Sequence, residues 1–287
     1  MTAAERADAI AAMGQNLGPE VLLGCEALFA AEQQALMAAV PAAARDIAYG
    51  AHPRHRLDLY GTPGAAAPVL LFVHGGGFVQ GDKGDGGRWV NAHVGRMAAR
   101  AGLLGAVMNY RLAPDHGWPA GAEDVAAAVD WLRARAGERG GDAGRIVAIG
   151  TSAGAVHLAG YLAAGGAGLR GAVLLSGLYG YTALDPRDER YYGVPALYPQ
   201  RMPRAALEAT GLPLLVACAE FDPPRFQSEF LALMAARLAC CGTMPRGYIA
   251  SGHNHYTLAM HLGTDDRRLE SEILDFVGRC CGGKEPR

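Results

Sequence analysis

The pattern of apolar and polar positions changes at Pro68. Beyond it, short apolar runs typical of buried strands alternate with longer stretches in which apolar residues recur at helical spacing. Because parallel strands are joined by crossover helices, this alternation predicts an α/β fold, with a mostly parallel sheet covered by helices on both faces. The predicted strands cover 69–73, 103–110, 145–150, 171–177, 212–219 and 247–251, and the predicted helices lie near 88–101, 121–136, 153–164, 226–241 and 265–281.

Ahead of this region the chain carries two other patterns. Residues 17–40 place apolar side chains at near-helical spacing, which predicts one or two amphipathic helices. Residues 46–50 and 55–61 are short extended segments, which predict an antiparallel edge of the sheet. The predicted organisation is an N-terminal helical segment over 1–45, serving either as a cap over a pocket or as a helix packed on the core, followed by one α/β domain over 46–287.

One long connection, residues 178–211, does not fit the alternation. It is rich in tyrosine and proline and has no regular period. Long connections of this kind are usually functional or disordered, and large aromatic side chains argue against disorder. We therefore expect this segment to form a wall of a pocket. The aromatic residues predicted to line the pocket are Phe78, Trp89, Tyr181 and Tyr192.

Composition narrows the class of partner. The chain has 26 Lys and Arg against 28 Asp and Glu, so it lacks the positive charge that attracts nucleic acid or an anionic membrane. No apolar run approaches the length of a bilayer span, and the first residues lack the apolar core of a secretory leader. The six cysteines have no zinc-type spacing and are interpreted as reduced thiols. We expect a cytoplasmic protein whose partner is a small molecule, and the sequence leaves room for a homodimer.

The segment GTSAG, residues 150–154, stands between a predicted strand and a predicted helix. A serine at such a strand–turn–helix elbow has an exposed hydroxyl beside the free N–H groups of the helix N-terminus, which suits a nucleophile. The alternative is that Ser152 is only a small residue at a tight turn. Because the motif also arises by chance in a glycine-rich chain, other motifs must support the first interpretation.

The segment HGGGF, residues 74–78, follows the predicted strand 69–73. Consecutive glycines allow the N–H groups of Gly76 and Gly77 to face a substrate oxygen, and the N–H of Ala153 adds a third donor, which predicts an oxyanion hole. The alternatives are a flexible loop and a phosphate cradle. A phosphate cradle would need Ser or Thr after its lysine, whereas Lys83 is followed by glycine. His74 is interpreted as a residue that fixes the loop.

An acid and a base follow the predicted serine nucleophile along the chain. Asp222 ends a predicted strand, where open α/β sheets place their active sites, and Glu220 is the alternative acid. Two histidines, His253 and His255, compete for the role of base. A His-x-His pair is also a metal pattern, but the sequence offers no third ligand at a known spacing. The order Ser152, Asp222, His255 is the order of serine, acid and histidine on nucleophile-elbow folds.

These motifs, together with YRLAPDHGWPAGAEDVAAAVDWL (110–132) and EFDPP, resemble the hormone-sensitive-lipase-like bacterial carboxylesterases of the α/β-hydrolase superfamily over roughly residues 46–280. The resemblance implies an α/β-hydrolase fold, Ser152 as nucleophile, Asp222 as acid and the oxyanion hole named above. In that family the histidine stands three residues after a glycine and shortly before an aromatic residue. This spacing selects His255, between Gly252 and Tyr256. The chain departs from the family at Thr151, where an acidic residue is common.

The predicted function is cleavage of carboxylic esters of short acyl or aryl groups through an acyl-enzyme, with no cofactor and no metal. Two alternatives stay open. The related arylformamidases share the HGG and SAGA patterns and cleave a formamide such as N-formylkynurenine. Other members of the fold bind a ligand without catalysis, and these typically lack the histidine.

Overall fold

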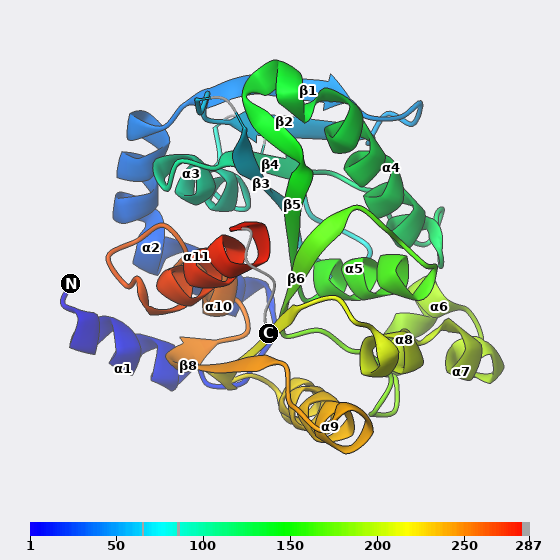
Figure 1. Cartoon of the computed structure of the whole chain (residues 1–287). Coiled ribbons are helices and arrows are strands. Elements are labelled where there is room, and N and C mark those ends of the chain that lie inside the picture. Colours follow the sequence, from blue (N-terminus) through cyan, green and yellow to red (C-terminus); the bar gives the residue numbers. More distant parts are fainter. Residues whose placement is uncertain (65, 85–86, 283–287) are drawn as a thin grey trace.

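The computed structural model describes residues 1–64, 66–84 and 87–282. Within this part of the chain an eight-stranded sheet runs through the centre of the molecule (Figure 1), in the order β1-β2-β4-β3-β5-β6-β7-β8. The first two strands pair antiparallel, and β2 pairs antiparallel with β4, whereas all other pairs are parallel. The strands are β1 (Ala42–Ala48), β2 (Arg56–Tyr60), β3 (Ala67–Val73), β4 (Leu104–Met108), β5 (Gly141–Thr151), β6 (Leu169–Leu175), β7 (Leu214–Phe221) and β8 (Arg246–Asn254).

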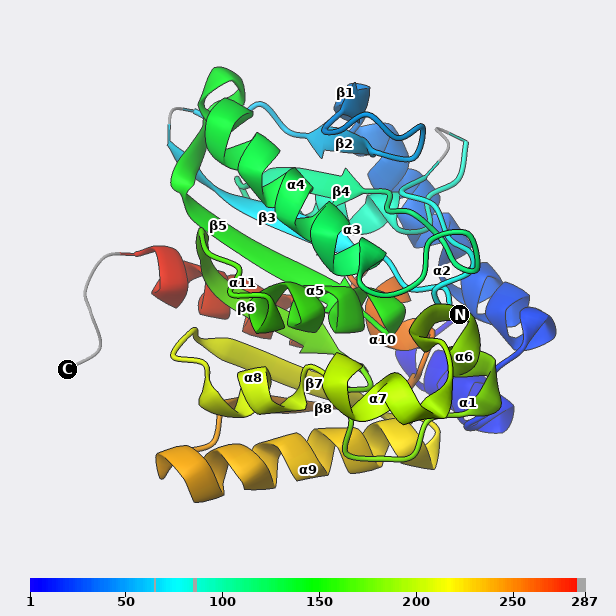
Figure 2. The ribbon, with the colours of Figure 1, turned by 90° about the vertical axis from the view of Figure 1, so that its right-hand side faces the viewer.

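The inner strands are apolar on both faces because helices cover both faces. In β3, Leu71 and Val73 pack into one core with α4, α5, α8 and α9, while Leu70 and Phe72 pack into a second core with α3, α10 and α11. Figures 1 and 2 show the two helical layers from different sides. The helices are α1 (Ala3–Met13), α2 (Pro19–Ala39), α3 (Ala92–Arg100), α4 (Ala120–Arg135), α5 (Ala153–Ala163), α6 (Glu189–Tyr192), α7 (Tyr198–Arg201), α8 (Arg204–Ala209), α9 (Pro224–Cys241), α10 (Thr257–Met260) and α11 (Arg268–Cys281).

The N-terminal helices lie outside the layer formed by α3 and α10. Helix α2 packs on both of them, and α1 lies beside β8. Their contact is apolar, because Ile10, Cys25 and Phe29 form a small core with Trp89 and Met260. The buried side chain of Gln33 fixes this arrangement, since its Nε2 donates to the carbonyl oxygens of Met260 and Leu262 at 2.8 and 2.9 Å.

The predicted fold class is confirmed, and every predicted strand is present. The first strand is displaced: 46–50 was expected, whereas β1 covers Ala42–Ala48. The reason is an irregularity at Asp46, which adopts a left-handed φ of 52° and breaks the register between Ala44 and Ile47. Five helices of the described chain lie outside the predicted helix ranges: α1, the single turn α10, and α6, α7 and α8. The irregular segment 178–211 contains only the short helices α6, α7 and α8 and brief 3-10 turns.

Four histidines are buried against the sheet and couple stability to pH. Burial lowers the pKa of His74 and His93 to about 4 and that of His157 and His261 to about 3. An unfolded histidine titrates near pH 6.5, so between about pH 6.5 and 4 the unfolded chain binds more protons than the folded one. Stability contributed by the neutral imidazoles is therefore present above about pH 6.5 and is lost as the pH falls.

We expect the free energy of unfolding, measured with urea, to fall between about pH 7 and pH 5, by up to about 1.4 kcal/mol per pH unit for each such histidine. His157→Gln removes one of the four titrating groups and should make the pH dependence shallower. An unfolding free energy that stays level over this range would contradict the buried neutral state of these side chains.

Candidate active site

Ser152 occupies the sharp turn between β5 and α5. Its φ of 52° and ψ of −120° lie outside the regions that most residues adopt, and helix α5 begins at the next residue, Ala153. Strain of this kind persists where the surrounding structure holds it and is concentrated at functional sites. The turn places the serine hydroxyl at the carboxyl end of the central strand, at the N-terminus of a buried helix.

The glycines of GTSAG are required by close packing. A Cβ on Gly150 would lie 2.5 Å from the carbonyl oxygen of Gly154, and a Cβ on Gly154 would lie 2.1 Å from the carbonyl oxygen of Val73. Any larger residue at either position would push α5 away from β3 and β5. The spacing of small residues around Ser152 is therefore explained by the contact between helix and sheet.

The structure brings Ser152, His255 and Asp222 together. The Nε2 of His255 lies 3.0 Å from the Oγ of Ser152, and its Nδ1 lies 2.7 Å from the Oδ1 of Asp222. Asp222 is fully buried, and its Oδ2 accepts hydrogen bonds from the hydroxyl of Ser176 and the N–H of Ala219. Since a carboxylate only accepts, Nδ1 carries a proton, and a neutral ring offers Nε2 to the serine hydroxyl.

The competing candidates lie elsewhere. Glu220 is exposed, and its Oε2 accepts a hydrogen bond from the N–H of Gly252 at 2.7 Å. His253 faces away from Ser152. Its Nδ1 lies 3.2 Å from the hydroxyl of Thr257, and its Nε2 lies 3.2 Å from the carboxylate of Asp266.

The HGGGF loop lies opposite the elbow. Gly76 has a φ of 130°, and a Cβ there would lie 2.0 Å from the carbonyl oxygen of Gln80, so only glycine fits. Gly77 is also left-handed, with a φ of 57°. In the described part of the chain, the N–H groups of Gly76, Gly77 and Ala153 donate no intramolecular hydrogen bond. Three backbone donors in a cavity wall can hold a negatively charged oxygen.

His74 fixes the start of this loop. Its Nδ1 donates to the carbonyl oxygen of Gly75 at 2.7 Å, and its ring stacks on Tyr110 with centroids 4.3 Å apart. The hydroxyl of Tyr110 donates to the carbonyl oxygen of His74 at 2.9 Å. His74 is fully buried and does not contact Ser152, in keeping with its interpretation as a loop-fixing residue.

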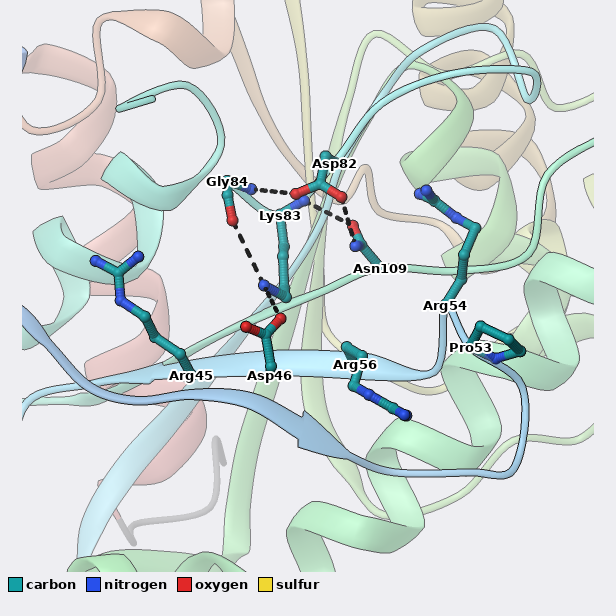
Figure 3. Close-up of a pocket in the computed structure, with 9 residues that line it drawn as sticks. All are labelled: Arg45, Asp46, Pro53, Arg54, Arg56, Asp82, Lys83, Gly84 and Asn109. Atoms are coloured by element: carbon teal, nitrogen blue, oxygen red, sulfur yellow. Dashed lines mark hydrogen bonds and ion pairs between the residues drawn. The ribbon is translucent and has the colours of Figure 1, made fainter. Parts of the chain in front are cut away.

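The far end of the loop is anchored by Lys83, shown in Figure 3. Its buried ammonium lies 2.8 Å from Asp46 and 2.9 Å from Asp58, on the two edge strands. Its backbone N–H donates to the side chain of Asn109 at 2.6 Å, and Asn109 donates to Asp82 at 2.7 Å. Burial alone would lower the pKa of Lys83, but the hydrogen bonds and charges of the two aspartates raise it above its usual value.

Replacing Lys83 by methionine is expected to lower the free energy of unfolding by about 3 kcal/mol, because the buried carboxylate of Asp58 is left without its cation. Asp46→Asn is the matched control. Since the side chain of Asp46 is 71% exposed, its loss should cost less than about 1 kcal/mol. Urea unfolding measures both values. Equal effects of the two substitutions would contradict the anchoring role of the Lys83–Asp58 contact.

Ser152 and the glycine loop open into a cavity of about 1150 Å³. Its lining includes Gly76, Gly77, Ser152, Ala153 and His255. The N-terminal segment forms another part of the wall, through residues 15–19 between α1 and α2 and through Leu22 and Glu26 of α2. The cavity is large enough for a small organic molecule.

The predicted aromatic lining needs correction. Phe78 lines the cavity, but Trp89, Tyr181 and Tyr192 do not. Trp89 is buried in the N-terminal core, Tyr192 is fully buried beside Phe78, and the hydroxyl of Tyr181 donates to Glu208 at 2.9 Å. Lining residues that the sequence did not single out include Leu22, Glu26, Arg88, Arg225, Phe226, Tyr256 and Met260, and the 178–211 segment, predicted as a wall, contributes Arg187, Asp188 and Arg190.

Known proteins resemble parts of this chain. The BD-FAE family model matches residues 57–170. Esterase LipC of Mycobacterium tuberculosis is 36% identical over 146 residues, which are 50% of this chain and 31% of that protein. Esterase LipI of the same organism is 42% identical over 93 residues, 31% of this chain and 27% of that protein. The chain thus spans less than a third of the length of these curated relatives.

The likeness to solved structures extends over nearly the whole chain. Esterase LipW from Mycobacterium marinum superposes with a TM-score of 0.68 at 21% identity, covering 94% of this chain and 92% of that one. Esterase B from Lactobacillus rhamnosis superposes with a TM-score of 0.69 at 19% identity, covering 97% of both chains. The chain has the α/β-hydrolase fold. In this fold, the elbow serine and the glycine loop occupy the carboxyl ends of β5 and β3.

The structure brings His253, His261 and Asp266 together, with ligand atoms within 4.8 Å of one another. The sequence offers no third metal ligand at a known spacing for the His253 and His255 pair, whereas the structure groups His253 with two other possible ligands. The two imidazole rings stack with centroids 3.9 Å apart, and Asp266 is also paired with Arg268 at 2.6 Å. Stacked rings direct their lone pairs along separate planes, so the arrangement favours a hydrogen-bonded cluster over a metal site.

In the described part of the chain, no helix is both long enough and apolar enough to cross a bilayer.

Proposed function

We propose that this α/β-hydrolase cleaves carboxylic esters of short acyl or aryl groups, with Ser152 as nucleophile, His255 as base and Asp222 as acid. The observation that carries the proposal is the continuous chain of hydrogen bonds from Ser152 through His255 to Asp222, at the floor of a cavity that also contains backbone donors. The four similar proteins cited above are all named esterases, which supports ester hydrolysis as the reaction.

The first step is attack of Ser152 on the ester carbonyl. His255 accepts the hydroxyl proton at Nε2 as the bond from oxygen to carbon forms. Asp222 holds the ring through Nδ1 and stabilises the imidazolium that results. Because Asp222 is buried and hydrogen-bonded at its second oxygen by Ser176 and Ala219, its orientation is fixed before the substrate binds.

Negative charge then develops on the former carbonyl oxygen. The N–H groups of Gly76, Gly77 and Ala153 are proposed as its donors, the last of them strengthened by the N-terminus of α5. His255 gives its proton to the departing alcohol, which leaves an acyl group on Ser152. Water, activated by the same histidine, releases the acid and restores the serine. No step of this chemistry calls for a cofactor or a metal.

The N-terminal segment over 1–45 is proposed as a cap on a catalytic domain over 46–287, except that residues 42–45 belong to β1 and therefore to the sheet. Residues 15–19 contribute to the cavity wall, and α2 adds Leu22 and Glu26. A cap of two helices encloses a limited space, which favours small esters over long-chain lipids.

Comparison of two substrates tests the proposed reaction. The kcat/KM for p-nitrophenyl butyrate should exceed that for N-formylkynurenine, with both rates measured beside Ser152→Ala as background. Faster cleavage of the formamide would assign the chain to the arylformamidases instead. Tight binding of a ligand that is recovered unchanged, with neither substrate cleaved, would favour the non-catalytic alternative.

A further inference from the structure

One wall of the active-site cavity carries an excess of positive charge. It is formed by residues 187–190, which lead into α6, and by residues 223–226 at the start of α9. Three arginines of this wall line the cavity, Arg187, Arg190 and Arg225, and the one carboxylate among its lining residues is Asp188.

Arg225 is held next to the predicted base. Its Nη2 donates to the Oδ2 of Asp188 at 2.8 Å, while its Nε is buried and has no acceptor among the described residues. The following residue, Phe226, lies against the imidazole of His255, with ring centroids 4.3 Å apart. Arg225, whose Nε has no acceptor, therefore directly precedes in sequence Phe226, the residue that packs on His255.

Arg190 has no partner at all in the described part of the chain: its exposed guanidinium makes no hydrogen bond and no ion pair there. Arg187 differs, because it is paired with both oxygens of Asp185 at 2.9 and 3.0 Å. Arg225 is matched by Asp188 and Arg187 by Asp185, whereas Arg190 has no ion-pair partner in the described part of the chain. The neighbouring carboxylate of Glu189 is not among the residues that line the cavity.

The rest of the lining shows no such excess. The guanidinium of Arg88 lies 3.1 Å from the carboxylate of Glu26 on α2, and Asp82 adds a further carboxylate. An anionic part of a bound molecule would consequently be attracted to the wall formed by residues 187–190 and 223–226.

We propose that the substrate is an ester that also carries a carboxylate, and that this carboxylate is bound by Arg190 and Arg225. The inference rests on the proposed ester hydrolysis and adds a substrate class to it. A guanidinium presents a planar set of N–H donors that matches the two oxygens of a carboxylate, which an uncharged ester could not exploit. Binding would give Arg190 the ion-pair partner that it lacks in the described part of the chain, and would engage the Nη1 of Arg225, which donates no hydrogen bond there, whereas the buried Nε stays out of reach.

Matched pairs of esters test the proposal. For charge on the acyl side, the p-nitrophenyl monoester of glutaric acid is compared with p-nitrophenyl pentanoate, which has a methyl group in place of the carboxylate. For charge on the alcohol side, 4-acetoxybenzoate is compared with 4-acetoxybenzamide. The rate with Ser152→Ala is subtracted as spontaneous hydrolysis. In one of the two pairs, kcat/KM for the anionic ester should be about five- to tenfold higher.

Substitution of the arginines provides the second part of the test. Arg190→Gln and Arg225→Gln should each reduce the ratio of the two kcat/KM values, and added salt should reduce it as well. The control is Arg204→Gln on α8, an arginine paired with Glu208 that does not line the cavity, for which the ratio should stay at the wild-type value.

Three contradicting outcomes are distinguishable. If the neutral esters are cleaved and neither pair shows a preference for the anion, the carboxylate inference is wrong and the proposed ester hydrolysis stands. A preference that survives both arginine substitutions would overturn the site assignment. If no ester of either pair is cleaved faster than with Ser152→Ala, the proposed function itself fails.

Discussion

Replacement of Ser152 by alanine is expected to lower kcat/KM for p-nitrophenyl butyrate by about 10⁴- to 10⁶-fold. The expectation follows from the geometry, because the Oγ that lies 3.0 Å from His255 is the only atom removed. Backbone donors of the glycine loop and the elbow remain, so a residual rate above that of water is expected. Initial rates at several substrate concentrations measure the effect.

Folding of the Ser152→Ala variant is the necessary control. Ser152 already holds a φ of 52° as a non-glycine residue, so alanine meets similar strain and the thermal midpoint should change little. A folded variant that retains most of its activity would show that the serine is only a turn residue.

The second large effect separates two neighbouring histidines. His255→Ala should lower kcat/KM by about 10⁴-fold or more, because proton transfer from Ser152 loses its acceptor and Asp222 is left without its partner. His253→Ala removes a ring that contacts Thr257, Asp266 and His261, so it should reduce stability and spare most of the activity.

The comparison requires both variants at a temperature where each is folded. Circular dichroism and thermal unfolding establish that condition, and p-nitrophenyl butyrate turnover is then measured under the same conditions. Loss of activity in His253→Ala together with retention in His255→Ala would reverse the assignment of the base.

Much of the fold was predictable because the inner strands are buried on both faces. Runs such as 69–73 and 146–150 are free of polar side chains, and the structure places them in β3 and β5. The edge was less predictable. The register of β1 shifts at Asp46, and the carboxylate of Asp46 pairs with the ammonium of Lys83. These two residues are 37 positions apart, so no local pattern in the sequence reveals the contact.

The candidate site likewise has one part that the sequence predicted and one part that it did not. Ser152 and the glycine loop are marked by local spacing, since packing of α5 and close approach of Gln80 require glycine at fixed positions. The lining depends instead on which side chains tertiary packing turns inward. Trp89 was an equally good candidate by composition, but the N-terminal helices cover it.

The sequence predicted that the 178–211 segment forms a wall of the pocket, but it gave no sign that arginines gather there. Arg187, Arg190 and Arg225 are separated by up to 38 positions, and their meeting depends on how the 178–211 segment folds back on α9. The same holds for His261 and Asp266, which come beside His253 only because α10 turns the chain after β8.

The central claim is that Ser152 carries the acyl group during turnover, and peptide mass spectrometry of the quenched protein tests it most directly. The protein is mixed with p-nitrophenyl butyrate, quenched with acid within the first turnover and digested. The account predicts a mass increase of one butyryl group on the peptide that contains Ser152, and none in Ser152→Ala. Rapid release of p-nitrophenol with no adduct on that serine, or with an adduct on another residue, would contradict the account.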